Sequence, residues 1–308
     1  MCRLLLIITL FISCNMANDT RIRLLDKREL LNFPSASAID FYNDKLYVTG
    51  DDARNMIVLD QSYAVLDSVS LFPGSGLRIP KKEKNDLEAS TIIRYNGKPY
   101  LLVTGSGSTE ERKVFFLFPL DTPGDYKKIE AHPFWQSLGM DSVNIEGLAT
   151  MNDKLIFSNR AHRKQPHNHL IIADISLIDD TAHTSPHILH LELPNEEQVV
   201  KGVSGLVYEP SLDLLLFTSS VEETDNAIED GTIGDSFLGY VKNFTAKATN
   251  KTVMPDALIN LPSVHPDFNG EKIESVCVES SGDELILHLV ADNDDGTSTI
   301  FKISLRLK

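Results

Sequence analysis

The sequence predicts an all-β protein, a five-bladed β-propeller, and three observations lead to this fold class. Five segments repeat one pattern: a serine or glutamate, an apolar strand, a tight polar turn, a second apolar strand and a polar cluster. The segments begin 51, 58, 58 and 70 residues apart, which suits four-stranded blades with loops of variable length. No long stretch shows helical periodicity. A propeller of six blades is the alternative.

The repeats follow one another along most of the chain. In order, they start at Ser37, Glu88, Glu146, Ser204 and Glu274. Their turns fall at residues 43–44, 96–97, 152–153, 210–211 and 281–283, where Asn-Asp, Asn-Gly and Gly-Asp pairs are typical of hairpins. Further strands are expected in the same blades, for example at residues 56–59, 65–71 and 113–118.

The last blade is one strand short. After the fifth start, the chain holds two strands and a third at residues 300–307. Residues 20–30 alternate apolar and charged side chains, as an additional strand would. We therefore expect the N-terminal strand to join the outer edge of the last blade, which closes the propeller and removes an exposed edge.

The N-terminus has the features of an export signal. Arg3 precedes an apolar run at residues 4–12 that is too short to span a bilayer, and Ser13-Cys14 follows it. This junction resembles the bacterial lipobox, whose cysteine is lipidated; an ordinary secretory signal is the alternative. We expect a signal peptide over 1–13, a tether over 14–19 and one propeller domain over 20–308. Lipidation of Cys14 would place the protein in the cell envelope, in the periplasm or at the surface, anchored to a membrane.

The net charge argues against one class of binding partner, and the cysteine content argues against an internal disulfide. The formal net charge is -15, from 29 Lys+Arg against 44 Asp+Glu, and such a surface repels nucleic acid. Cys2 leaves with the signal and Cys14 would carry lipid, so Cys277 has no partner for a disulfide and is expected to be a buried apolar side chain. We expect a monomer.

The repeat pattern also predicts a polar site at one mouth of the central channel. The first strand of each propeller blade lines the channel, so the five starting residues would form a ring there, called the channel ring below. The second strand returns to the same mouth and brings its polar end with it: Asp51, Asp52, Arg160, His162, Glu222, Asp292 and Asp294.

Three glutamates facing one channel repel one another, so protons or a cation must offset their charge. Oxygen ligands favour Ca²⁺, with Mg²⁺ as the second candidate. The alternative is a structural role, in which each glutamate accepts hydrogen bonds from backbone N–H groups and water fills the channel.

The order Ser-Glu-Glu-Ser-Glu resembles the calcium-activated soluble nucleotidases (apyrases), five-bladed propellers with one central Ca²⁺. The segments Ser37-Ala38-Ile39, Asp51-Asp52 and Asn159-Arg160-Ala161 are similar to motifs of that family. The resemblance implies that the channel ring holds Ca²⁺ and that Arg160 contacts phosphate or another anion. The chain also resembles bacterial propeller lipoproteins, and Ile145-Glu146-Gly147-Leu148 is similar to blade starts of esterase-like phytase domains.

The sequence departs from the nucleotidase pattern in one important way. Those enzymes carry a segment with Trp and Lys before the first blade, and residues 21–33 have no such motif. The single tryptophan, Trp135, lies between the second and third repeats. The resemblance therefore extends to the metal site and not to the nucleotidase activity.

Three other clusters carry weaker signals. His162, His167 and His169 match no compact zinc motif, so their spacing by itself predicts no transition-metal site. Residues 292–296 lack the spacing of a calcium loop and are expected to form a hairpin turn. Lys82 belongs to a basic loop, residues 78–84, near the expected mouth, which would suit a small anionic substrate.

Two classes of function follow. The sequence slightly favours a binding or scaffold module, anchored to the membrane through its lipid and recognising a protein partner. The alternative is a Ca²⁺-dependent hydrolase of nucleotides or other phosphate esters and anhydrides, with Asp51 or Asp52 as general base and Arg160 and Lys82 offsetting the developing charge. Propellers host both classes.

Overall fold

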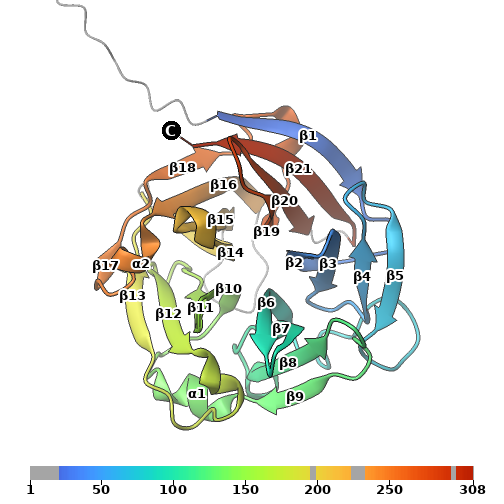
Figure 1. Cartoon of the computed structure of the whole chain (residues 1–308), viewed down its shortest axis with the longest axis vertical. Helices are drawn as coiled ribbons and strands as arrows, with labels where there is room; N and C mark the ends of the chain where they lie inside the picture. The colour runs from blue at the N-terminus through green and yellow to red at the C-terminus, as the bar shows by residue number, and fades with distance from the viewer. Residues whose placement is uncertain (1–20, 195–198, 223–232, 293–295, 308) are drawn as a thin grey trace, which may run out of the picture.

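A computed structural model describes residues 21–194, 199–222, 233–292 and 296–307, apart from the side chain of Glu222. It shows five small sheets arranged as blades around a common axis (Figure 1), which confirms the five-bladed propeller. The innermost strands are β2, β6, β10, β14 and β19, defined below, and neighbouring blades pack against one another through them.

Each blade is a sheet of antiparallel strands in sequence order. Blade 1 holds β2 (Ala36–Tyr42), β3 (Lys45–Gly50), β4 (Asn55–Leu59) and β5 (Val65–Ser70). Blade 2 holds β6 (Leu87–Tyr95), β7 (Lys98–Gly105), β8 (Val114–Pro119) and β9 (Lys127–Glu130). Blade 3 holds β10 (Ile145–Met151), β11 (Lys154–Asn159), β12 (Asn168–Asp174) and β13 (His187–Leu191). Blade 4 holds β14 (Lys201–Glu209), β15 (Leu214–Glu222), β16 (Ile233–Lys242) and β18 (Ala257–Asn260).

Blade 5 is built from both ends of the described chain. Strands β19 (Ile273–Ser280), β20 (Leu285–Asp292) and β21 (Ser298–Arg306) are followed at the outer edge by β1 (Arg21–Glu29). Strand β1 pairs antiparallel with β21 over its whole length, and Figure 1 shows the two strands side by side. The predicted closure by the N-terminal strand is confirmed.

The hairpin turns follow the residues that predicted them. Asn43 and Asp44 have φ angles of 51° and 61°, and Asn96 and Gly97 have φ angles of 50° and 77°. Positive φ at both central positions is the requirement of type I′ turns, which favour Asn, Asp and Gly. These turns set the register between the inner two strands of blades 1 and 2.

The loops between the blade strands contain short helices and one small strand. They are α1 (His132–Ser137), α2 (Phe244–Lys247) and four 3₁₀ turns at Glu110–Arg112, Ile175–Ile178, Pro210–Leu212 and Pro266–Phe268. The two-residue strand β17 (Thr252–Val253) leaves the loop of blade 4 and pairs in parallel with β13 of blade 3. This fifth strand was not expected, because two residues carry no periodic signal.

Apolar side chains fill the space between blades. Helix α1 inserts Phe134 and Trp135 beside Phe115 of blade 2 and Phe157 of blade 3, with the Trp135 and Phe157 ring centroids 5.5 Å apart. Trp135 therefore serves the core between two blades. Cys277 is buried with a free thiol, as expected, and burial raises its pKa well above the usual range. Among the described residues, no helix is long and apolar enough to cross a membrane; Cys14 and the predicted signal lie outside them.

Candidate functional site

All five channel-ring residues occupy the same structural position in their blades. Near its start, the pairing of each innermost strand with its neighbour skips one residue, and these residues are Ser37, Glu88, Glu146, Ser204 and Glu274. Each ring residue thus sits at a β-bulge near the start of its strand. Bulges redirect a side chain away from the regular pleat and are frequent beside binding sites.

The two ring serines connect neighbouring blades. The hydroxyl of Ser37 donates a hydrogen bond to the backbone carbonyl of Leu87, at 2.5 Å. The hydroxyl of Ser204 donates to the carbonyl of Ile273, at 2.6 Å. Since Leu87 and Ile273 precede the ring glutamates of the next blades, these bonds couple the ring positions of blades 1 and 2 and of blades 4 and 5.

Arg160 joins two ring glutamates on one side of the mouth. Its Nη1 lies 3.4 Å from Glu146 Oε2 and 3.7 Å from Glu274 Oε2, and its Nη2 donates to Ser220 Oγ at 2.9 Å. Lys272 adds a second cation 3.1 Å from Glu274 Oε1. All these side chains are buried or nearly so. The chain therefore supplies its own positive charges to Glu146 and Glu274.

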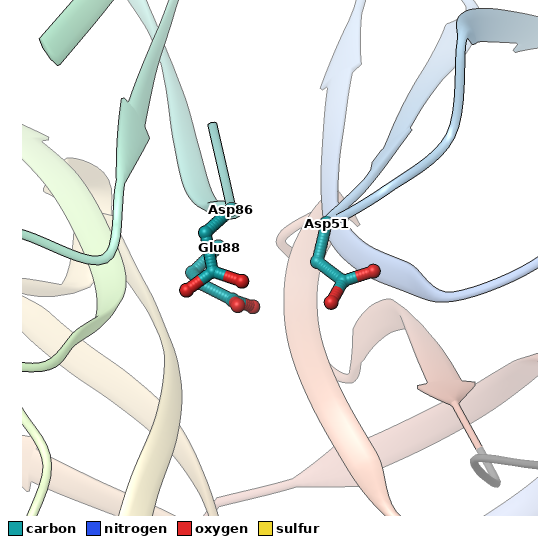
Figure 2. Close-up of side chains that lie close together, drawn as sticks. All are labelled: Asp51, Asp86 and Glu88. Carbon is teal, nitrogen blue, oxygen red and sulfur yellow. The ribbon is translucent and has the colours of Figure 1, made fainter. Parts of the chain in front are cut away.

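A cluster of three carboxylates occupies the other side of the mouth. Asp51, at the end of blade 1's second strand, faces Asp86 and Glu88 at the start of β6, as Figure 2 shows. One ligand oxygen from each lies within 4.8 Å of the others, and these three form the one such group of His, Cys, Asp or Glu in the described part of the chain. The three residues are called the acidic cluster below.

Two of the three carboxylates have cationic partners. Lys84 Nζ pairs with Asp51 and lies 2.7 Å from Asp86 Oδ1. Arg112 Nη1 donates to Asp86 Oδ2 at 2.7 Å. Within the described residues, the Glu88 carboxylate has neither a hydrogen bond nor an ion pair.

Burial raises the pKa of Glu88 well above its usual range, and the negative charges of Asp86, Glu146 and Asp51 raise it further. The ammonium of Lys84 acts in the opposite direction without cancelling these effects. Burial likewise raises the pKa of Asp51, while the ion pair with Lys84 lowers it. Glu88 is thus the position in the mouth where negative charge is least compensated by the chain.

The remaining predicted residues belong to neither of these two groups. Asp52 is buried, accepts a hydrogen bond from Ser35 and pairs with Arg78 Nε at 2.7 Å. His162 is buried. The backbone N–H of Asp292 donates to the carbonyl of Lys272. Lys82 is exposed in its loop. The side chain of Glu222 and residue Asp294 lie outside what the structure describes.

Asp86 is the site residue that the sequence argument missed. It directly precedes β6 and lies two positions before Glu88, outside the regular alternation of the strand, so the repeat pattern did not identify it. Asp86 itself has φ of 57°, a left-handed conformation that Asp tolerates better than most residues. Ser106 Oγ and Arg112 then fix its carboxylate.

The fold is similar to that of two solved structures of distant sequence. Glutaminyl cyclase from Myxococcus xanthus has a TM-score of 0.53 and 10% identity, over 93% of this chain and 97% of that one. The tail fiber of Staphylococcus aureus phage P68 has a TM-score of 0.50 and 11% identity, over 94% of this chain and 54% of that one. At such identities the likeness concerns the fold alone. No curated protein matches the sequence. Residues 32–305 match the family of unknown function DUF6929, and the chain belongs to that family.

Proposed function

We propose that the protein is an exported, lipid-anchored binding or scaffold module whose channel mouth holds one divalent cation, Ca²⁺ in preference to Mg²⁺. The observation that carries the cation site is the acidic cluster, with Glu88 lacking any partner among the described residues. Carboxylate oxygens are the ligands that Ca²⁺ selects, and water in the channel can complete its six to eight positions.

The charges of the site favour a cation next to Glu88. Asp51, Asp86 and Glu88 contribute three negative charges when ionised, and Lys84 and Arg112 contribute two positive ones. A divalent ion held by Glu88 and one or two of the aspartates would offset the repulsion among these carboxylates. Lys84 would then compete with the ion for the same oxygens.

The surroundings of Arg160 support a binding module over the phosphohydrolase alternative. A phosphohydrolase of the resembled kind would need this guanidinium to contact an anionic substrate. Arg160 is buried and directed at Glu146, Glu274 and Ser220. An incoming phosphate would have to displace those carboxylates, at the cost of leaving buried negative charges unpaired.

The proposed anchor is compatible with an accessible mouth. Strand β1 begins directly after the predicted tether and runs along the outer edge of the propeller (Figure 1). A lipid on Cys14 would therefore attach the protein by its periphery, away from the central channel.

Calcium titration of the chain after signal removal, with Cys14→Ser, tests the cation site. We expect one Ca²⁺ per chain by calorimetry, and a rise in Tm that EDTA reverses, since ligand at a hundred times its Kd stabilises by about 2.7 kcal/mol. Glu88→Gln and Asp86→Asn should weaken binding. Asp67→Asn, on the exposed strand β5, is the matched control.

Lys84→Gln sharpens the test. Removing the competing ammonium should tighten Ca²⁺ binding by roughly tenfold or more, while lowering stability in EDTA. If Ca²⁺ has no effect on either the wild type or this variant, the acidic cluster is a structural ion-pair network and the cation site is refuted. If the protein hydrolyses nucleotides or phosphate esters and Glu88→Gln abolishes this activity, the protein is a hydrolase and the binding-module proposal is wrong.

A further inference from the structure

Three histidines gather at the outer part of blade 3, far along the sheet from the channel ring. His169 lies in β12, His190 lies in β13, and His167 directly precedes β12. The function proposed above makes no use of them. They are called the histidine cluster below.

Strand pairing brings the three imidazoles to one face of the sheet. His169 and His190 are direct partners in the antiparallel pair of β12 and β13. His167 precedes His169 by two residues, so it projects to the same side. The ring centroids of His169 and His190 are 4.6 Å apart, and those of His167 and His190 are 5.7 Å apart.

These separations suit a shared metal ion. Zn²⁺ binds imidazole nitrogen at about 2.0–2.1 Å in tetrahedral geometry, which places the centroids of two coordinated rings about 5 Å apart. The two observed separations lie on either side of that value. The ring nitrogens of the three histidines do not all lie within 4.8 Å of one another in the structure, so metal binding requires the rings to turn about χ1 and χ2 toward a common point.

The space next to His167 and His190 can hold an ion and a further ligand. A cavity of about 690 Å³ is lined by His167, His190 and Glu192, with Thr252 of β17 at its edge. The Nδ1 atom of His169 is buried and has no hydrogen-bond partner in the described structure.

We propose that His167, His169 and His190 form a binding site for a divalent transition-metal ion, Zn²⁺ first, with Glu192 or water as the fourth ligand. Three imidazoles with one open or carboxylate-filled position are an established ligand set for Zn²⁺. The site differs from the channel mouth in chemistry, because nitrogen ligands select transition metals and the acidic cluster offers only oxygen.

Zinc and cobalt titrations of protein without a polyhistidine tag test the site. We expect one Zn²⁺ per chain by calorimetry in the presence of saturating Ca²⁺, and the intense visible absorption of tetrahedral Co²⁺ on cobalt addition. His190→Ala should weaken Zn²⁺ binding by roughly 100-fold or more, because losing only an outer partner of a metal ligand already costs 10–100-fold.

Two controls make the outcome decisive. His183→Ala removes an exposed histidine outside the cluster and should leave Zn²⁺ affinity unchanged. Glu88→Gln should also leave it unchanged, which separates this site from the channel mouth. The proposal is overturned if wild type and His190→Ala, both shown to be folded by circular dichroism, bind Zn²⁺ equally well or if neither binds it.

Discussion

Replacing Asp40 by asparagine should stabilise the protein at alkaline pH and leave its stability at acid pH nearly unchanged. Asp40 is buried in β2 and faces the innermost strand of blade 2. Its carboxylate accepts hydrogen bonds from Ser90 Oγ and the backbone N–H of Ile92. Burial outweighs both bonds and raises the pKa of Asp40 from 3.8 to about 7.

The shift gives the magnitude and sign of the effect. Below pH 3.8 the carboxyl is protonated in the folded and unfolded states, so it costs nothing. Between pH 3.8 and about 7 the unfolded chain releases the proton and the folded protein keeps it, so stability falls as pH rises. A shift of about three pKa units amounts to about 4 kcal/mol above pH 7. Asparagine resembles the protonated form, and the Ser90 hydroxyl can rotate to accept from its amide.

Urea denaturation of wild type and Asp40→Asn at pH 4.5, 6 and 8 measures this effect. The free-energy difference between them should grow from about 1 kcal/mol at pH 4.5 to about 4 kcal/mol at pH 8, with a rise in Tm of roughly 8 °C at pH 8. Asp44→Asn makes the same chemical change in an exposed turn and should show no growth with pH. A difference that is equal at all three pH values would refute the assignment of a buried, protonated carboxyl.

Three further changes test other parts of the fold. Arg160→Met should lower the free energy of unfolding by about 3–5 kcal/mol in urea denaturation, because it leaves buried carboxylates without their cation. Arg160→Lys should lower it less. A loss below about 1 kcal/mol for Arg160→Met would contradict the ion-pair network. His288 is buried between Tyr63 and Glu279, and burial lowers its pKa from 6.5 to about 4. This group adds about 3 kcal/mol of stability above pH 6.5 that disappears as pH falls toward 4, and His288→Asn should flatten this part of the pH profile. Deleting residues 21–29 should expose the edge of β21 and produce aggregation in size-exclusion chromatography, whereas a monomer of unchanged Tm would show that β1 is dispensable.

The repeat in the sequence was enough to predict the architecture. The starts at Ser37, Glu88 and their equivalents were recognisable because every blade needs the same bulge near the channel. The closing strand was predictable from a count of strands and from the alternation in residues 21–29. Strand β17 was not predictable, because its pairing depends on where a long loop passes over the neighbouring blade.

The site was predictable in its location and only partly in its contacts. Asp51 and Glu88 were expected at one mouth, and the structure brings them together. The sequence argument expected three ring glutamates to share one centre, but Arg160 and Lys272 draw Glu146 and Glu274 into ion pairs. Which cation reaches which carboxylate depends on side-chain length and direction, and a linear pattern of residues holds no information on either.

The antiparallel pairing of β1 with β21 also determines the order in which the blades can fold. Strand β1, the first of the described chain, has no partner strand until β21 has been synthesised and has reached it. Four blades can assemble from nearby segments, while the fifth awaits a contact between residues almost 300 positions apart, such as Arg21 and Arg306. Because closing so large a loop is entropically unfavourable before other contacts hold its ends together, blade 5 should form last, and its formation should be the slow step of folding.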